Sequence, residues 1–101
     1  MTVAITIVGM NRIGASIGLA LASQKHQLTR TGIDREPGKT QQAHKMGAVD
    51  ETSVNLEKTV AQADVVILCV PLHELKENLE IILPALKPEA VVLDTSPLQV
   101  Q

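Results

Sequence analysis

The sequence predicts an α/β fold in which helices cover both faces of a parallel sheet. Two observations support this prediction. Short runs of β-branched and aliphatic residues alternate with longer segments whose apolar residues recur at helical spacing, and the alternation continues along the whole chain. A first strand that ends at a glycine and leads into a helix is followed by a second unit of the same kind. With 101 residues, we expect one domain, residues 1–101, with a modest core.

The expected elements follow one another in regular order. The strands are expected at residues 3–8, 27–34, 48–50, 65–70 and 90–94. The helices are expected at residues 12–24, 35–47, 54–62 and 72–86. Unbroken apolar runs predict strands buried on both faces, whereas apolar residues at intervals of three or four predict helices that pack on the sheet. Pro37 and Gly47 delimit the second helix.

The fourth helix has a leucine-rich stripe that we expect to face the sheet. The polar residues between these leucines are expected to point outward. They are His73, Glu74, Lys76, Glu77 and Glu80.

Alternating strands and helices imply parallel pairing through right-handed crossovers. The expected strand order is 3-2-1-4-5, a Rossmann-like doubly wound sheet that is truncated after its fifth strand. In such sheets, ligands bind at the carboxyl ends of the strands where the order reverses, here between the first and fourth strands. The residues at the expected strand ends are Gly9, Asp34, Pro71 and Asp94.

The composition excludes several function classes. The chain has no Phe, Tyr or Trp and a net charge of −2, so it lacks both the stacking platforms and the basic surface that nucleic acids require. It has no basic leader and no apolar run approaching the ~20 residues that cross a bilayer, so we expect a cytoplasmic protein without membrane contact. No cysteine and histidine cluster predicts a metal site. Cys69, the single cysteine, is expected to fill the core as part of an apolar strand.

The turn after the first strand resembles a dinucleotide-binding fingerprint. In G-x-G-x-x-G, the first glycine makes the bend, the second admits the pyrophosphate and the third lets the helix contact the strand. The helix that begins near Arg12 presents N–H groups and a positive dipole end to an anion. The candidate phosphate-binding residues are Gly9, Met10, Asn11, Arg12, Ile13 and Gly14.

Two of these residues have alternative interpretations. Asn11 stands where the middle glycine is expected, and its side chain would crowd the pyrophosphate. Asn tolerates positive φ and can donate a hydrogen bond, so we expect binding that is weakened without being abolished. Arg12 could neutralise pyrophosphate charge, or it could be a solvated arginine.

Asp34 follows Gly14 at the spacing of about 20 residues at which a carboxylate accepts hydrogen bonds from the adenosine ribose. Its structural alternative is an aspartate that caps a turn or helix. A carboxylate repels a 2′-phosphate and therefore favours NAD, but Arg35 beside it could pair with that phosphate. The residues leave NADP open as a second cofactor.

The three histidines are not expected to take part in the site. His26 and His44 fall in a turn and on a polar helix face, and His73 is expected on an exposed helix face near the nicotinamide end.

Four segments together resemble the amino-terminal domain of prephenate and arogenate dehydrogenases. They are ITIVGMNRIGASIGLAL, GIDRE, AHKMGAVDE and AQADVVILCVPLHELKENLEIILPALKPEAVVLD. The resemblance spans the chain and implies an NAD(P)-dependent oxidoreductase of tyrosine biosynthesis, which oxidises a cyclohexadienol carboxylate by hydride transfer with decarboxylation. It also implies that a segment beside the nicotinamide contributes cofactor contacts. The further cofactor-binding residues expected are Cys69, Val70, Pro71, Thr95 and Ser96.

The chain departs from the family pattern at Asn11 and in the segment SPLQ, which begins at Ser96 where the family has Gly-Ser-x-Lys. The resemblance places the catalytic histidine and an all-helical, dimer-forming domain beyond this segment. We therefore expect the chain alone to be catalytically incompetent, either as an excised cofactor domain or as a truncated binding protein. The alternatives are a domain of another hydroxy-acid or imine dehydrogenase, and a non-catalytic nucleotide-sensing module.

Overall fold

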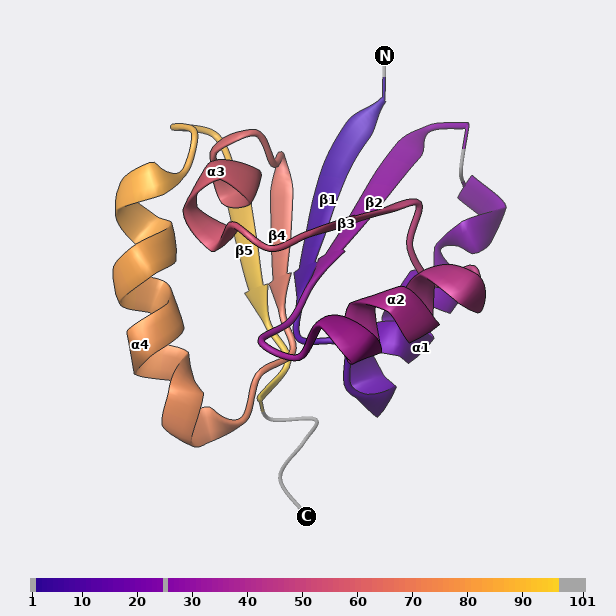
Figure 1. Cartoon of the computed structure of the whole chain (residues 1–101). Coiled ribbons are helices and arrows are strands. Elements are labelled where there is room, and N and C mark those ends of the chain that lie inside the picture. Colours follow the sequence, from indigo (N-terminus) through magenta and orange to yellow (C-terminus); the bar gives the residue numbers. More distant parts are fainter. Residues whose placement is uncertain (1, 25, 97–101) are drawn as a thin grey trace.

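A five-stranded parallel sheet with the order β3-β2-β1-β4-β5 forms the centre of the molecule (Figure 1). The structure is a computed structural model that describes residues 2–24 and 26–96. The strands are β1 (Val3–Val8), β2 (Leu28–Ile33), β3 (Glu51–Ser53), β4 (Val65–Leu68) and β5 (Val91–Asp94). The predicted doubly wound sheet and its strand order are therefore confirmed.

Helices cover both faces of the sheet, as Figure 1 shows. On one side lie α1 (Arg12–Ala20) and α2 (Pro37–Lys45), and on the other lie α3 (Leu56–Ala61) and α4 (Leu72–Ile82). Two short 3₁₀ helices, η1 (Ala22–Gln24) and η2 (Leu83–Ala85), follow α1 and α4.

Two aliphatic clusters form the core, one on each face. The first is built around Ile5, Ile7, Met10, Ala43, Ala48, Val49, Ile67 and Cys69. The second is built around Val8, Ile33, Val60, Ala63, Val66, Leu68, Val70 and Ile82. Alternate residues of β1 and β4 enter opposite clusters, which explains why both strands are apolar apart from Thr6.

Glycines allow α1 to lie close to its neighbours. A Cβ atom at Gly14 would stand 2.0 Å from the carbonyl oxygen of Gly9, and one at Gly18 would stand 2.1 Å from that of Ala48. Side chains at either position would push the helix away from the first turn or from the segment that precedes β3. Gly14 and Gly18 therefore form a packing surface on α1.

The predicted third strand was wrong by three residues. Ala48 and Val49 are buried in the core as part of a connection, and pairing with β2 begins only at Glu51. Ala48 and Val49 are buried by side-chain packing without forming strand hydrogen bonds. Their apolar character alone therefore suggested a strand that begins too early.

Several other boundaries also differ from the prediction. The helix expected at 12–24 ends at Ala20 and continues as η1, and the strand expected at 65–70 ends at Leu68. The helix expected at 72–86 ends at Ile82, because Pro84 has no N–H to continue the α-helical pattern and the chain continues as η2.

Candidate functional site

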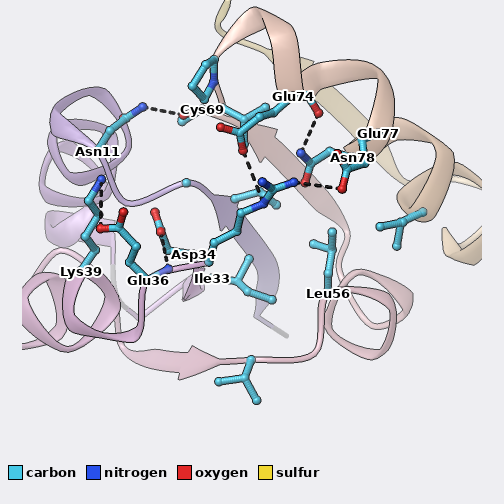
Figure 2. Close-up of a pocket in the computed structure, with 17 residues that line it drawn as sticks. Asn11, Ile33, Asp34, Glu36, Lys39, Leu56, Cys69, Glu74, Glu77 and Asn78 are labelled. Carbon is cyan, nitrogen blue, oxygen red and sulfur yellow. Dashed lines mark hydrogen bonds and ion pairs between the residues drawn. The ribbon is translucent and has the colours of Figure 1, made fainter.

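The carboxyl ends of β1, β2 and β4 open into a cleft of about 320 Å³, drawn in Figure 2. The cleft lies beside the point where the strand order reverses between β1 and β4. The expected site residues that line it are Gly9, Asn11, Asp34, Arg35, Cys69, Val70 and Pro71. Its position therefore agrees with the rule that ligands of doubly wound sheets bind at the switch point.

Gly9 makes the tight bend at the end of β1. Its φ of +98° lies in the left-handed region, and a Cβ atom there would stand 2.6 Å from the carbonyl oxygen of Cys69. The Gly9 N–H donates to the carbonyl of Ile33 at 2.7 Å, which ties the turn to β2. Only glycine combines this conformation with so close an approach to β4.

Asn11 caps the N-terminus of α1 and links it to β4. Its Oδ1 accepts a hydrogen bond from the N–H of Gly14 at 2.9 Å, and its Nδ2 donates to the carbonyl of Cys69 at 2.6 Å (Figure 2). Its φ is −78°, so the tolerance of Asn for positive φ is not used here. The residue fits because Asn is among the best N-caps, and the cap requires an extended backbone.

The start of α1 retains donors for an anion. The Gly14 N–H is taken by Asn11, but the N–H groups of Arg12 and Ile13 have no acceptor within the described residues. The first turn of a helix leaves such groups without intrahelical partners, and they carry the positive end of the dipole. Two backbone donors at the N-terminus of α1 are therefore left for an anion, next to the cleft lining at Gly9 and Asn11.

Asp34 connects the two turns at the ends of β1 and β2. Its Oδ2 accepts from the N–H of Met10 at 2.7 Å and its Oδ1 from the N–H of Glu36 at 2.8 Å. The structural alternative considered for this residue is thus realised. Each carboxylate oxygen can accept a second hydrogen bond, so the same group that orders the turns can also bind a hydroxyl in the cleft.

Arg35 lies at the rim of the cleft and pairs with α4. Its Nη2 stands 3.0 Å from Oε1 of Glu77, and its Nε stands 3.5 Å from Oε1 of Glu74. Glu77 is exposed as expected, whereas Glu74 is half-buried, and both line the cleft from one side of the helix (Figure 2). Apolar periodicity identifies the buried stripe of a helix but does not separate the flanks on either side of it.

Several expected site residues lie away from the cleft. The Met10 side chain is buried in the first core cluster and Ile13 packs against that cluster, whereas Arg12 is exposed. Thr95 is buried at the end of β5, where its Oγ1 donates to the carbonyl of Leu68 at 2.8 Å. Ser96 is also buried, and its N–H donates to Oδ1 of Asp94 at 2.8 Å.

The cysteine and histidines show no reactive arrangement. Cys69 is fully buried, and this burial raises the pKa of its thiol above the ordinary value. His26, His44 and His73 are exposed. Within residues 2–24 and 26–96, no three potential ligands gather as a metal site would require, and no helix is long and apolar enough to span a bilayer. Of the SPLQ segment, only Ser96 belongs to the described part of the chain.

Sequence reasoning missed two groups of polar residues. Glu36, Lys39 and Asn78 line the cleft together with the two glutamates of α4. Arg30, only 4% exposed, forms an ion pair with Asp50 away from the cleft, with Nη2 3.0 Å from Oδ1. An arginine between the apolar ends of a strand was the available signal, since such a charge needs a buried partner.

Comparisons with known proteins give a consistent result. A family model described as "Prephenate dehydrogenase, nucleotide-binding domain" matches residues 17–101. Cyclohexadienyl dehydrogenase of Zymomonas mobilis is 27% identical over 96 residues, which cover 95% of this chain and 33% of that protein.

Solved structures share the fold of this chain. The crystal structure of Synechocystis arogenate dehydrogenase is similar with a TM-score of 0.79 and 30% identity, covering 90% of this chain and 32% of that one. Prephenate dehydrogenase from A. aeolicus, crystallised with hydroxyphenyl propionate and NAD⁺, has a TM-score of 0.82 and 23% identity, covering 94% and 34%. The chain thus spans about a third of the length of each of these relatives.

Proposed function

The chain belongs to the prephenate dehydrogenase nucleotide-binding domain family, and on this basis we propose that it binds NAD for a prephenate or arogenate dehydrogenase of tyrosine biosynthesis. One observation carries the proposal. The tight turn at Gly9, the start of α1 and the carboxylate of Asp34 all border the cleft at the switch point of the sheet. This is the combination of features that a dinucleotide requires.

Each part of the site has a distinct task in this proposal. The N–H groups of Arg12 and Ile13 bind the pyrophosphate, and Asp34 accepts hydrogen bonds from the adenosine ribose. The segment from Cys69 to Pro71 borders the nicotinamide. Because Asp34 already holds the N–H groups of Met10 and Glu36, its carboxylate is oriented before the cofactor arrives.

The reaction of the whole enzyme is the oxidation of a ring alcohol with loss of carbon dioxide. Bound NAD supplies the hydride acceptor. The described residues contribute binding and orientation, while a base for the hydroxyl proton has to come from elsewhere, because the three histidines of the chain are exposed and do not line the cleft. We therefore expect the 101-residue chain to bind cofactor without turning over substrate.

Titration of the ¹⁵N-labelled chain with NAD tests the binding site. We expect amide shifts in residues 9–14 and at Asp34, and Asp34→Asn should weaken binding because it removes the charge and one acceptor oxygen. Asp64→Asn is the matched control, since Asp64 also accepts a backbone N–H, from Ala4, but lies outside the lining of the cleft. Shifts that avoid the turn, or equal effects of the two substitutions, would contradict the assignment.

Turnover is tested separately with the same chain. Loss of a positioned base alone typically costs about 10²–10⁴-fold in rate, and loss of substrate positioning costs more. With prephenate or arogenate and NAD, we expect no formation of NADH above the rate without protein. Measurable NADH would show that the chain contains a proton acceptor of its own.

A further inference from the structure

The rim of the cleft carries more negative than positive charge, and its cations are already paired. Four carboxylates line the cleft, together with two cations, Arg35 and Lys39. Lys39 Nζ lies 3.6 Å from Oε2 of Glu36, and Arg35 reaches Glu74 and Glu77. Both cations that could attract a phosphate to this rim therefore have carboxylate partners within the chain.

The pairing of Arg35 connects opposite walls of the cleft. Arg35 follows β2 next to Asp34, whereas Glu74 and Glu77 stand on α4, which begins after β4. Residues three apart lie on the same side of a helix, so the two carboxylates converge on one guanidinium. The side chain of Glu74 is only 22% exposed, while those of Arg35 and Glu77 are 62% and 66% exposed. The guanidinium is thereby drawn toward α4.

We propose that Glu74 and Glu77 are specificity-determining residues that exclude a 2′-phosphate from this cleft. This inference rests on the proposed NAD function. It assigns the choice between NAD and NADP to α4 as well as to Asp34. The two carboxylates occupy the arginine that would otherwise form charge-assisted hydrogen bonds with the phosphate. They also add negative potential near the position that the phosphate would take.

The test compares NAD and NADP binding by calorimetry in the unmodified chain and in Glu74→Gln/Glu77→Gln. Glutamine keeps the size of the side chains, and because the shared partner Arg35 is 62% exposed, these ion pairs contribute little to folding and the variant is expected to fold. With Arg35 released and two charges removed, NADP affinity should rise about tenfold, while NAD affinity should change less than about threefold. The gain for NADP should shrink in high salt, because salt screens exposed charges.

Glu57→Gln/Glu80→Gln is the matched control. It removes two carboxylates from α3 and α4 that do not line the cleft, so the net charge of the chain changes equally. A similar gain for NADP in this control would overturn the proposal, because it would show an effect of net charge alone.

Adding Arg35→Gln to the α4 double variant tests the role of the arginine. The gain for NADP should shrink to the part that comes from removing two negative charges, and a gain of unchanged size would overturn the assignment of Arg35. Binding of NAD without any gain for NADP in the double variant would overturn this inference and leave the proposed function standing. If no variant bound either cofactor, both would fall.

Discussion

Asn11 takes the place of a glycine by using its side chain to order the turn. The extended backbone and the cap on the Gly14 N–H fix the start of α1, and the bond to the Cys69 carbonyl fixes this start against β4. A glycine at this position would provide neither interaction. The residue that departs from the fingerprint therefore contributes to the stability of the cleft that the fingerprint describes.

Replacing Asn11 by glycine should separate its two interactions. Loss of an Asn cap to Gly costs a few tenths of a kcal/mol, and loss of a side-chain hydrogen bond costs about 0.5–1.5 kcal/mol, so we expect Asn11→Gly to lower the free energy of unfolding by about 1–2 kcal/mol. Asn55→Gly is the matched control, because Asn55 caps α3 through the Lys58 N–H at 2.9 Å and has no comparable bond to a strand.

Urea unfolding followed by far-ultraviolet circular dichroism provides the measurement. The loss for Asn55→Gly should stay below about 0.5 kcal/mol. Equal losses for the two variants would show that the bond to Cys69 has no net value. NAD titration of the same variant then reports whether the Asn11 side chain crowds the pyrophosphate, in which case the affinity rises.

At the level of single residues, the sequence predicted positions better than partners. Gly9 and Asp34 could be placed at strand ends because apolar runs reveal where buried strands stop. The partners of Asp34 and Arg35 could not be predicted, since they depend on how the turns after β2 and the start of α4 meet in space. No local pattern in the sequence encodes that distance.

Among the elements, β2 is tied to its surroundings by a buried charge. Nη1 of Arg30 donates to the carbonyls of Gly18, Gly47 and Ala48 at 2.7, 2.9 and 3.0 Å. The guanidinium also reaches both carboxylate oxygens of Asp50, with Nε 3.2 Å from Oδ2 and Nη2 3.0 Å from Oδ1. One side chain thus joins the last part of α1, the loop after α2 and the approach to β3.

Removing the Arg30 side chain should lower the free energy of unfolding, because it breaks this junction. Arg30→Met removes the guanidinium donors from Asp50 and from three carbonyls. Breaking a buried pair costs about 3–5 kcal/mol, and we expect the lower end of this range because the Asp50 side chain is 34% exposed and keeps the Arg30 N–H. Arg12→Met, which removes an exposed arginine, should change the free energy of unfolding by less than about 0.5 kcal/mol. Chemical denaturation measures both.

If Arg30→Met does not fold, Asp50→Asn still tests the junction. It keeps an acceptor oxygen for the guanidinium while removing the compensating charge, so we expect a smaller loss than for Arg30→Met. A variant at either position that is as stable as the unmodified chain would show that the pair contributes no net stability.

The helices and strands could be predicted where the hydrophobic pattern of the sequence matches the burial of the residues. Strands β1 and β4 and helix α4 carry long apolar patterns, and each was found close to its expected residues. Strand β3 is a three-residue edge strand with exposed Glu51 and Thr52, so hydrophobicity could not locate it. Its position is set by the Arg30 junction and by the burial of Ala48 and Val49.

On the scale of the whole molecule, Asp64 links the amino-terminal ends of three strands, at the edge of the sheet opposite the cleft. Its Oδ2 accepts from the Ala4 N–H at 2.8 Å and its Oδ1 from Lys87 Nζ at 2.9 Å. Its carbonyl accepts from the Val91 N–H at 3.0 Å, so β1, β4 and β5 all begin around it. The Ala4 N–H and the Lys87 ammonium lower the pKa of Asp64 below its ordinary value of 3.8.

This lowered pKa predicts part of the acid sensitivity of the fold. The unfolded chain binds the proton of Asp64 more readily than the folded chain, so the stabilisation is complete above the ordinary pKa of 3.8 and is lost as the pH falls through the lower native value. The urea midpoints of the unmodified chain and Asp64→Asn should therefore differ at pH 5 and converge toward pH 2. Glu57→Gln, on the exposed side of α3, should show no such convergence, and a constant difference for Asp64→Asn would refute the linkage.

The absence of Phe, Tyr and Trp has an optical consequence. With no Trp, Tyr or Phe anywhere in the sequence, folding changes neither protein fluorescence nor absorbance near the aromatic bands. Cys69 offers a chemical signal instead, because its thiol is fully buried and should become reactive toward a disulfide reagent only when the sheet opens. Because the protein has no intrinsic aromatic fluorescence, the emission of reduced nicotinamide is free of protein background. Cofactor binding and unfolding can therefore be followed in the same sample by two independent optical signals.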